Sequence, residues 1–327
     1  MIKSEKKNSI KDPVITVIIT AHDRKEFLKY AILSVLNQSL DKSLYEIIVI
    51  KNFEDDGIDR TIEENGILNL KSSKNSLIGE DLYFASKSAA GEILCFLDDD
   101  DMFSSDKLEK VYNIFYNDKS IVYYHNAQQS SHFSRQDSNA HVLFKKIFTH
   151  EELIRNLPRF IRTYGSSIFF FNLSSISIRK GAYFKYLNFL HKLSIHPDDF
   201  FFFVGLEIGG KFYFDDLSLT IYRIHSSNTS IIKKDIDSTN NSYFKKKSNL
   251  FENYAEATHY ILSISHNKDI KKFLKCREIL ELFQMNFYRN KISFYVMIST
   301  FVCSHCNGFK YTIWLVLYLM REKRGFL

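Results

Sequence analysis

The sequence predicts an α/β protein whose mostly parallel sheet is flanked by helices and followed by a helical C-terminal extension. Three apolar and β-branched runs, 14–20 (VITVIIT), 45–51 (YEIIVIK) and 91–97 (GEILCFL), are typical of parallel strands buried on both faces. Helical periodicity follows the first and third runs, over 23–39 and 104–117. Strands and helices that alternate with short connections indicate a parallel sheet with right-handed crossovers.

Local signals predict further elements of the same domain. Asp23 is a candidate N-cap for the first helix. Two more strands are expected at 121–127 (IVYYHNA) and 173–180 (LSSISIRK), and alternation of apolar and polar residues predicts that the second is half-buried. A further helix is predicted to start at Pro197 and to end at Gly209-Gly210.

A change in composition near residue 230 suggests a boundary. The chain beyond this point is helical and basic, so we expect a catalytic domain over 1–230 and an extension over 231–327. With 45% hydrophobic and 25% charged residues, the 327-residue chain has a globular composition, which excludes a disordered protein. The net charge of +6 is modest and lacks the dense basic stripe of a nucleic-acid binder.

The four cysteines are too few in a chain of this length for a disulfide framework. Cys303 and Cys306 form a CxxC, but no second pair accompanies it, so a zinc or redox role is not favoured. Because the N-terminal segment MIKSEKKNSIKDP has no apolar core like that of a signal peptide, we expect an intracellular protein.

Four consecutive carboxylates, Asp98–Asp101, directly follow the third predicted strand. Adjacent negative charges repel one another, so a fold that holds them at a strand end needs a counter-charge. Asp98 and Asp100 form a DxD whose alternate carboxylates can face one way and hold Mg²⁺ or Mn²⁺ with a nucleotide diphosphate. Two simpler interpretations remain open: an acidic turn exposed to water, and an acidic cluster capping the next helix.

Several ordered segments together resemble the family 2 glycosyltransferases, which have the GT-A fold, a Rossmann-like α/β domain. These segments are VIITAHDRKEFLKYAILSVLNQSL, YEIIVIKN, GEILCFLDDDD, HPDDFFFF and YRIHSSNTS. The resemblance covers roughly residues 13–230, and its strength lies in the order and spacing of the motifs.

The resemblance implies catalytic roles for Asp198 and Asp199, with Asp199 as the base that deprotonates the acceptor. A carboxylate beside another is biased toward a raised pKa, which favours a base, although the two charges could simply stabilise a helix N-terminus. His225 matches a histidine that completes the metal or diphosphate site, so the implied metal ligands are Asp98, Asp100 and His225. Arg223 is an accessory candidate for the diphosphate charge.

The resemblance also places the nucleotide in the turn after the first strand, at Thr20, Ala21, Asp23 and Arg24. After the second strand the chain has Lys51 and Asn52, where the family commonly has an aspartate pair. Asn52 can still hydrogen-bond a base edge, because an amide both donates and accepts. Asp99, with Asp101, is expected to orient the ligands or hold the sugar.

We therefore expect an inverting, metal-dependent glycosyltransferase. It would use Mn²⁺ or Mg²⁺ to transfer a sugar from a UDP- or GDP-sugar to a hydroxyl acceptor in cell-surface or lipid-linked glycan assembly. Two alternatives remain. A non-catalytic nucleotide-sugar-binding subunit is suggested only by the altered turn at Lys51 and Asn52, and a metal-dependent phosphoryl-transfer enzyme lacks a nucleophile-aspartate motif and a P-loop.

Two apolar runs lie near the C-terminus, ISFYVMISTFVC (292–303) and YTIWLVLYLM (311–320). Each is shorter than the roughly 20 residues that span a bilayer. Trp314, several tyrosines and the final REKR are typical anchors of a membrane interface. We expect peripheral contact with the cytoplasmic face of the membrane; the alternative is that both runs are core helices.

Overall fold

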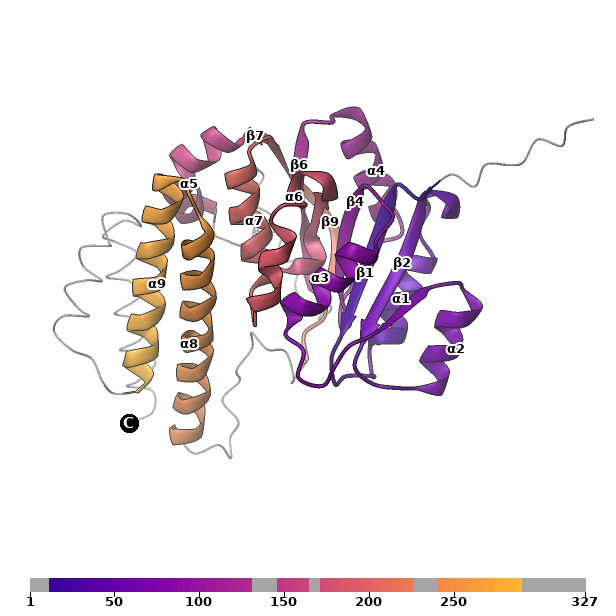
Figure 1. The fold of residues 1–327 in the computed structure, drawn as a ribbon, viewed down its shortest axis with the longest axis horizontal. Coiled ribbons are helices and arrows are strands. Elements are labelled where there is room, and N and C mark those ends of the chain that lie inside the picture. The colour runs from indigo at the N-terminus through magenta and orange to yellow at the C-terminus, as the bar shows by residue number, and fades with distance from the viewer. Residues whose placement is uncertain (1–11, 131–145, 165–170, 226–239, 290–327) are drawn as a thin grey trace, which may run out of the picture.

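A computed structural model describes residues 12–130, 146–164, 171–225 and 240–289 (Figure 1). The described strands form one nine-stranded sheet, in the order β3-β2-β1-β4-β8-β6-β9-β5, with β7 also pairing with β9. Helices pack on both faces of this sheet, and a pair of long helices lies at one end of the molecule (Figure 1). This is the predicted α/β fold class with its C-terminal helices.

The parallel half of the sheet carries the predicted strand runs. It consists of β1 (Ile15–Ala21), β2 (Tyr45–Lys51), β3 (Leu68–Lys71) and β4 (Ile93–Asp98). β1 lies between β2 and β4, and Thr20 pairs with Asp98 in the register. Parallel strands end at the same edge, so the turn after β1 and the aspartate run after β4 are neighbours.

The other half of the sheet is largely antiparallel. Its strands are β5 (Met102–Phe103), β6 (Ile121–Ser130), β7 (Ile147–Thr149), β8 (Ile176–Arg179) and β9 (Lys211–Tyr222). β8 runs antiparallel to both β4 and β6, which leaves it in the middle of the sheet. Its residues 176–178 are therefore buried on both faces, and the prediction of a half-buried strand was wrong.

One layer of helices covers the face to which Ile15, Val17 and Ile19 point. It comprises α1 (Leu28–Leu36), α2 (Asp56–Glu64) and α4 (Lys107–Asn117). The predicted N-cap was wrong: α1 begins after Phe27, and Asp23 has a φ of 58°, in the left-handed region. A short 3-10 helix, Lys42–Leu44, precedes β2.

A second layer covers the opposite face of the sheet. It comprises α3 (Ile78–Ser88), α5 (His150–Tyr164), α6 (Lys180–Tyr183) and α7 (Pro197–Ile208), with 3-10 helices at Leu173–Ser175 and Leu187–Lys192. α7 starts at Pro197 and ends at Gly209, as the sequence predicted. Its four consecutive phenylalanines, 200–203, are fully buried in this layer.

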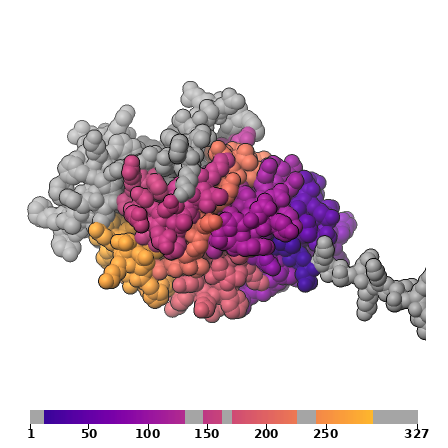
Figure 2. Space-filling view, turned by 90° about the horizontal axis from the view of Figure 1, so that it is seen from above, coloured from indigo at the N-terminus to yellow at the C-terminus, as the bar shows by residue number. Residues whose placement is uncertain are grey.

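The C-terminal pair is formed by α8 (Asn240–Ile264) and α9 (Lys268–Tyr288). It packs against the middle of the chain, as both views show (Figures 1 and 2). Ile261 and Leu274 belong to the same hydrophobic cluster as the α7 phenylalanines, and the ring of Phe273 lies 5.7 Å from that of Phe203. The division of the chain near residue 230 stays a prediction, but the hydrophobic core is continuous across it.

Two predictions concern residues outside the described ranges. The apolar runs 292–303 and 311–320, and the pair Cys303 and Cys306, lie beyond Arg289. Within the described ranges, none of the helices combines the length and apolar character that crossing a membrane requires.

Gly79 sets how closely α3 approaches the 3-10 helix at Leu187–Lys192. A Cβ at this position would lie 1.9 Å from the Leu190 carbonyl oxygen, which is backbone and cannot turn aside. We therefore expect Gly79→Ala to reduce the free energy of unfolding by about 1–3 kcal/mol, the usual cost of overpacking. Urea unfolding measures this change. Gly181→Ala is the matched control, because no atom lies within 4 Å of its Cβ; equal effects of the two variants would contradict the expectation.

Candidate active site

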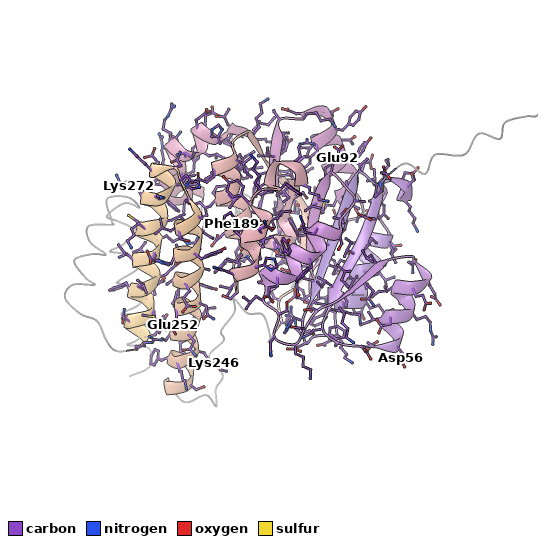
Figure 3. The ribbon with its side chains drawn as sticks, viewed as in Figure 1. Asp56, Glu92, Phe189, Lys246, Glu252 and Lys272 are labelled. Atoms are coloured by element: carbon purple, nitrogen blue, oxygen red, sulfur yellow. The ribbon has the colours of Figure 1, made fainter. Side chains whose placement is uncertain are left out.

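A cavity of about 630 Å³ opens at the carboxyl ends of β1 and β4. Glu92, just before β4, and Asp56, which starts the helix after β2, mark the two opposite edges of the parallel strands in Figure 3. The cavity walls come from the strand ends, the start of α3, the segments 171–173 and 194–198, and α8. Segments far apart in sequence thus meet at the edge where sheets of this type bind ligands.

The aspartate run forms a tight turn at the end of β4. The backbone N–H of Asp99 donates to the Thr20 carbonyl at 3.2 Å, and that of Asp101 donates to the Asp98 carbonyl at 3.1 Å. Oxygen atoms of Asp98, Asp100 and Asp101 all lie within 4.8 Å of one another. Such a set of hard oxygen donors fits Mg²⁺ or Mn²⁺.

Burial and mutual repulsion raise the pKa values of three carboxyl groups in this turn. Burial, followed by repulsion from the neighbouring aspartates, raises the pKa of Asp98 well above its usual value. Burial also raises the pKa of Asp99 to about 7 and that of Asp101 to about 6. These carboxylates are ionised more readily when a cation is added, so the electrostatics agree with the geometry of a metal site.

Arg24, predicted to bind the nucleotide, lies directly on the aspartate run. Its guanidinium forms an ion pair with Asp99, and its Nη1 lies 2.8 Å from Asp100 Oδ2. Thr20 and Ala21 line the cavity beside it. The turn after β1 thus supplies one cation, Arg24, to the acidic cluster. The same cation could also pair with a phosphate in the cavity.

His225 and Arg223 reach the same cluster from the end of β9. His225 Nε2 lies 2.9 Å from Asp100 Oδ2. The backbone N–H of Arg223 donates to Asp101 Oδ1, and its Nε donates to the Asp100 carbonyl, both at 3.0 Å. Pairing of β5 with β9 brings this segment back to the aspartates. Asp98, Asp100 and His225, the predicted metal ligands, are therefore neighbours.

The other predicted nucleotide residues contact each other. Asn52 Oδ1 accepts from the backbone N–H of Asp23 at 2.8 Å, and Asn52 Nδ2 donates to Asp23 Oδ1 at 3.0 Å. Neither residue lines the cavity described above. Lys51, the departure from the family pattern, is buried and forms a 2.8 Å ion pair with Asp59, away from the aspartate run.

Behind the aspartates lie polar residues that the sequence reasoning missed. Asn172 Nδ2 donates to Asp101 Oδ2 at 2.9 Å, and Ser174 Oγ accepts from the Asp98 N–H at 3.0 Å. The fully buried Lys107 donates to the Ser174 carbonyl and to Thr220 Oγ1. In the sequence Lys107 looks like an ordinary residue of a helix start, so no local signal could have identified it.

The predicted catalytic pair lies across the cavity at the start of α7. Asp198 lines the cavity, whereas Asp199 is buried and forms an ion pair with Arg277 of α9. The charge of Asp198 contributes to the raised pKa of Asp98, which places the pair in electrostatic contact with the aspartate run. The two acidic motifs, separated by about a hundred residues in the sequence, therefore share one cavity.

His196, just before this pair, has a φ of 59° and also lines the cavity. Its Nδ1 lies 3.5 Å from Asp198 Oδ1 and 3.8 Å from Asp199 Oδ2. Burial alone would lower the pKa of His196, but the two carboxylates outweigh burial and raise it. The ring of Tyr254 on α8 packs 4.1 Å from the His196 ring, and Tyr254 and Asn253 complete the cavity wall.

A Rossmann-like sheet with a DxD cluster at its carboxyl edge and a second acidic pair across one cavity defines a nucleotide-sugar glycosyltransferase of the GT-A type. Residues 16–177 match the model of glycosyl transferase family 2, so the chain carries a domain of this family. A search of the curated proteins finds no match.

Solved structures share the fold at low sequence identity. TarS residues 1–349 from S. aureus, in complex with UDP-GlcNAc, superimposes with a TM-score of 0.57 at 12% identity, over 88% of this chain and 79% of that one. The mannosyltransferase PcManGT from Pyrobaculum calidifontis, in complex with GDP-Man and Mn²⁺, gives 0.56 at 10% identity, over 96% and 87%. These comparisons establish the shared fold.

Burial of Lys107 makes a pH-dependent contribution to stability. Burial lowers the pKa of its ammonium from 10.5 to about 7. Between these values the unfolded chain holds the proton and the folded chain does not, so stability rises with pH across this window and the gain is lost as the pH falls through about 7. We expect the free energy of unfolding of the wild type, relative to Lys107→Met, to increase from pH 7 to pH 9.5.

Urea unfolding over that pH range measures the difference. Lys110→Met is the matched control, because Lys110 is exposed on the same helix. If the difference in free energy of unfolding between wild type and Lys107→Met did not change with pH, Lys107 would be protonated in the folded protein over the whole range.

Proposed function

We propose that the chain is an inverting glycosyltransferase that moves a sugar from a nucleoside-diphosphate sugar to an acceptor hydroxyl. One observation carries the proposal: Asp98, Asp99 and Asp100 of the aspartate run and Asp198 of the acidic pair line a single cavity. A transferase needs charge control at the departing diphosphate and a base at the acceptor, and these two motifs can supply the two functions.

The donor is proposed to be a UDP- or GDP-sugar. Complexes of TarS with UDP-GlcNAc and of PcManGT with GDP-Man and Mn²⁺ support this choice. Asp98, Asp100 and His225 would hold Mn²⁺ or Mg²⁺, as the cluster of oxygen donors permits. The metal, when bound, would supply positive charge to the departing diphosphate.

The chain's own residues then act on both sides of the sugar. Arg24, which lines the cavity at the aspartate run, would contact diphosphate oxygens, and Thr20, Ala21 and Asp99 would border the donor. Arg223, bonded to the Asp100 carbonyl, is proposed as an accessory cation for the diphosphate. A carboxylate of the acidic pair takes the proton of the acceptor hydroxyl. The freed oxygen forms a bond to the anomeric carbon from the face opposite the leaving group, whose electron pair departs with the nucleoside diphosphate, so the configuration inverts.

Loss of either DxD carboxylate should weaken metal-dependent donor binding. We expect Asp98→Asn and Asp100→Asn each to weaken binding of UDP-GlcNAc or GDP-Man in the presence of Mn²⁺ by at least about tenfold, because a charged ligand is lost. Titration calorimetry with and without Mn²⁺ measures this. Asp118→Asn is the control, because Asp118 pairs with Lys211 and does not line the cavity. Unchanged affinity and metal dependence in both variants would refute the metal site.

A turnover assay on the same donors separates the competing functions. Metal-dependent release of nucleoside diphosphate supports the transferase. Release of inorganic phosphate would instead support a phosphoryl-transfer enzyme, and binding without turnover would support a non-catalytic subunit.

We further propose that the acceptor is a cell-surface or lipid-linked glycan, reached at the cytoplasmic face of the membrane. The support is the sequence after Arg289, with its two apolar runs and final REKR. Exposed lysines of α8 and α9, among them Lys246 and Lys272, would add attraction to anionic headgroups (Figure 3). An acceptor embedded in lipid is reached more readily by an enzyme held at the same surface.

Membrane association can be tested by sedimentation. We expect the full-length chain to sediment with vesicles that contain anionic lipid, and a chain ending after Arg289, which keeps all of α9, to stay in the supernatant and still bind donor. Full-length protein that stays in the high-speed supernatant at physiological salt, without detergent, would contradict the membrane proposal and favour core helices at 292–303 and 311–320.

A further inference from the structure

An arginine of the C-terminal helix pair reaches the acidic pair at the start of α7. Arg277 Nη2 forms an ion pair with Asp199 Oδ2, and Arg277 Nε lies 2.8 Å from Glu281 Oε1. Only 4% of the Asp199 side chain and 8% of the Glu281 side chain are exposed, so water screens neither carboxylate well. One guanidinium therefore contacts two sheltered carboxylates, and its removal would leave Glu281 without this ion pair and Asp199 with only His196 as a cationic neighbour.

The two adjacent aspartates are placed differently. Successive residues of a helix point about 100° apart, so at the start of α7 one carboxylate faces the cavity and the next faces α9. Asp198 lines the cavity and its side chain is 13% exposed, whereas Asp199 does not line the cavity and is engaged by Arg277. A general base must come within hydrogen-bond reach of the proton it takes, and Asp198 is the member of the pair that a molecule in the cavity can reach.

Neighbouring groups hold Asp198 in this place. His196 Nδ1 lies 3.5 Å from Asp198 Oδ1, and the Tyr254 ring fixes the imidazole from the α8 side. His196 Nε2 is buried without a hydrogen-bond partner among the described residues. The start of α7 is thus braced by α8 through Tyr254 and by α9 through Arg277.

We propose that Asp198 is the catalytic base and that Arg277 is a positioning residue, which holds Asp199 and thereby fixes the turn that presents Asp198. The inference rests on the proposed transferase function and deepens it. The family resemblance implies Asp199 as the base, whereas this inference assigns the base to Asp198. It also makes the C-terminal helix pair part of the catalytic unit.

The test compares single variants in donor hydrolysis, with UDP-GlcNAc and GDP-Man as donors and water as acceptor. Asp198→Asn should lower kcat by about a hundredfold or more while donor affinity stays within about twofold, because the base is lost and the donor site is kept. Asp199→Asn and Arg277→Gln should each lower kcat by about tenfold. Their double variant should be no worse than either single variant, because both act through one contact.

Chemical rescue distinguishes a base from a supporting residue. Formate should restore activity to Asp198→Ala, where the lost carboxylate opens to the cavity, and should not restore Asp199→Ala. Arg277→Lys, which keeps a cation, should recover part of the activity lost in Arg277→Gln. Arg289→Gln is the matched control, because Arg289 also joins α9 to a glutamate, Glu252 of α8, away from the cavity; its kcat should match the wild type.

The outcomes separate this inference from the proposed function. A larger kcat loss in Asp199→Asn than in Asp198→Asn, or formate rescue of Asp199→Ala alone, overturns the assignment while the transferase stands. Additive losses in Asp199→Asn and Arg277→Gln overturn the positioning role. If wild type and Arg289→Gln both bind the donors but hydrolyse neither, the proposed function fails and this division of roles fails with it. Donor binding by each variant shows that it is folded.

Discussion

Concentrated negative charge at one edge of the sheet is the constraint on which this structure depends. Four aspartates lie at the end of β4, and Asp198 faces them across the cavity with Asp199 buried beside it. The fold places an arginine against each group: Arg24 at the aspartate run and Arg277 at the acidic pair. Burial and repulsion between the aspartates still raise the pKa values of Asp98, Asp99 and Asp101, and a bound metal would stabilise their ionised forms.

The parallel and antiparallel halves of the sheet each bring different residues to this cluster of aspartates. Parallel strands deliver the turn after β1 and the aspartate run to one edge, because parallel strands end together. The antiparallel half returns β9 to the same edge through its pairing with β5, which brings Arg223 and His225 to Asp100 and Asp101. A cluster built from both halves is held by backbone pairing on two sides, as a rigid metal or diphosphate site requires.

Much of this could be predicted from the sequence where the signal is local. The runs that became β1, β2 and β4 are long and apolar, and Pro197 and Gly209 bracket α7. The remaining features depend on tertiary contacts, which the sequence does not reveal. Asp23 has the chemistry of a helix cap, yet hydrogen bonds with Asn52 hold it outside α1. Lys107 and Arg277 resemble ordinary surface residues of helices, because burial and partners distant in sequence give them their roles.

The family match ends at residue 177, before the cavity residues on α7 and α8. The matched segment, 16–177, contains the turn after β1 and the aspartate run, to which the proposed function assigns the donor. Asp198, Tyr254 and Arg277 all lie beyond it, on α7, α8 and α9. Many transferases share the chemistry of the donor, whereas each acceptor needs its own binding surface. The proposed function therefore assigns the acceptor side to α7 and the helix pair, and the hydrophobic core that the pair shares with α7 holds these elements together.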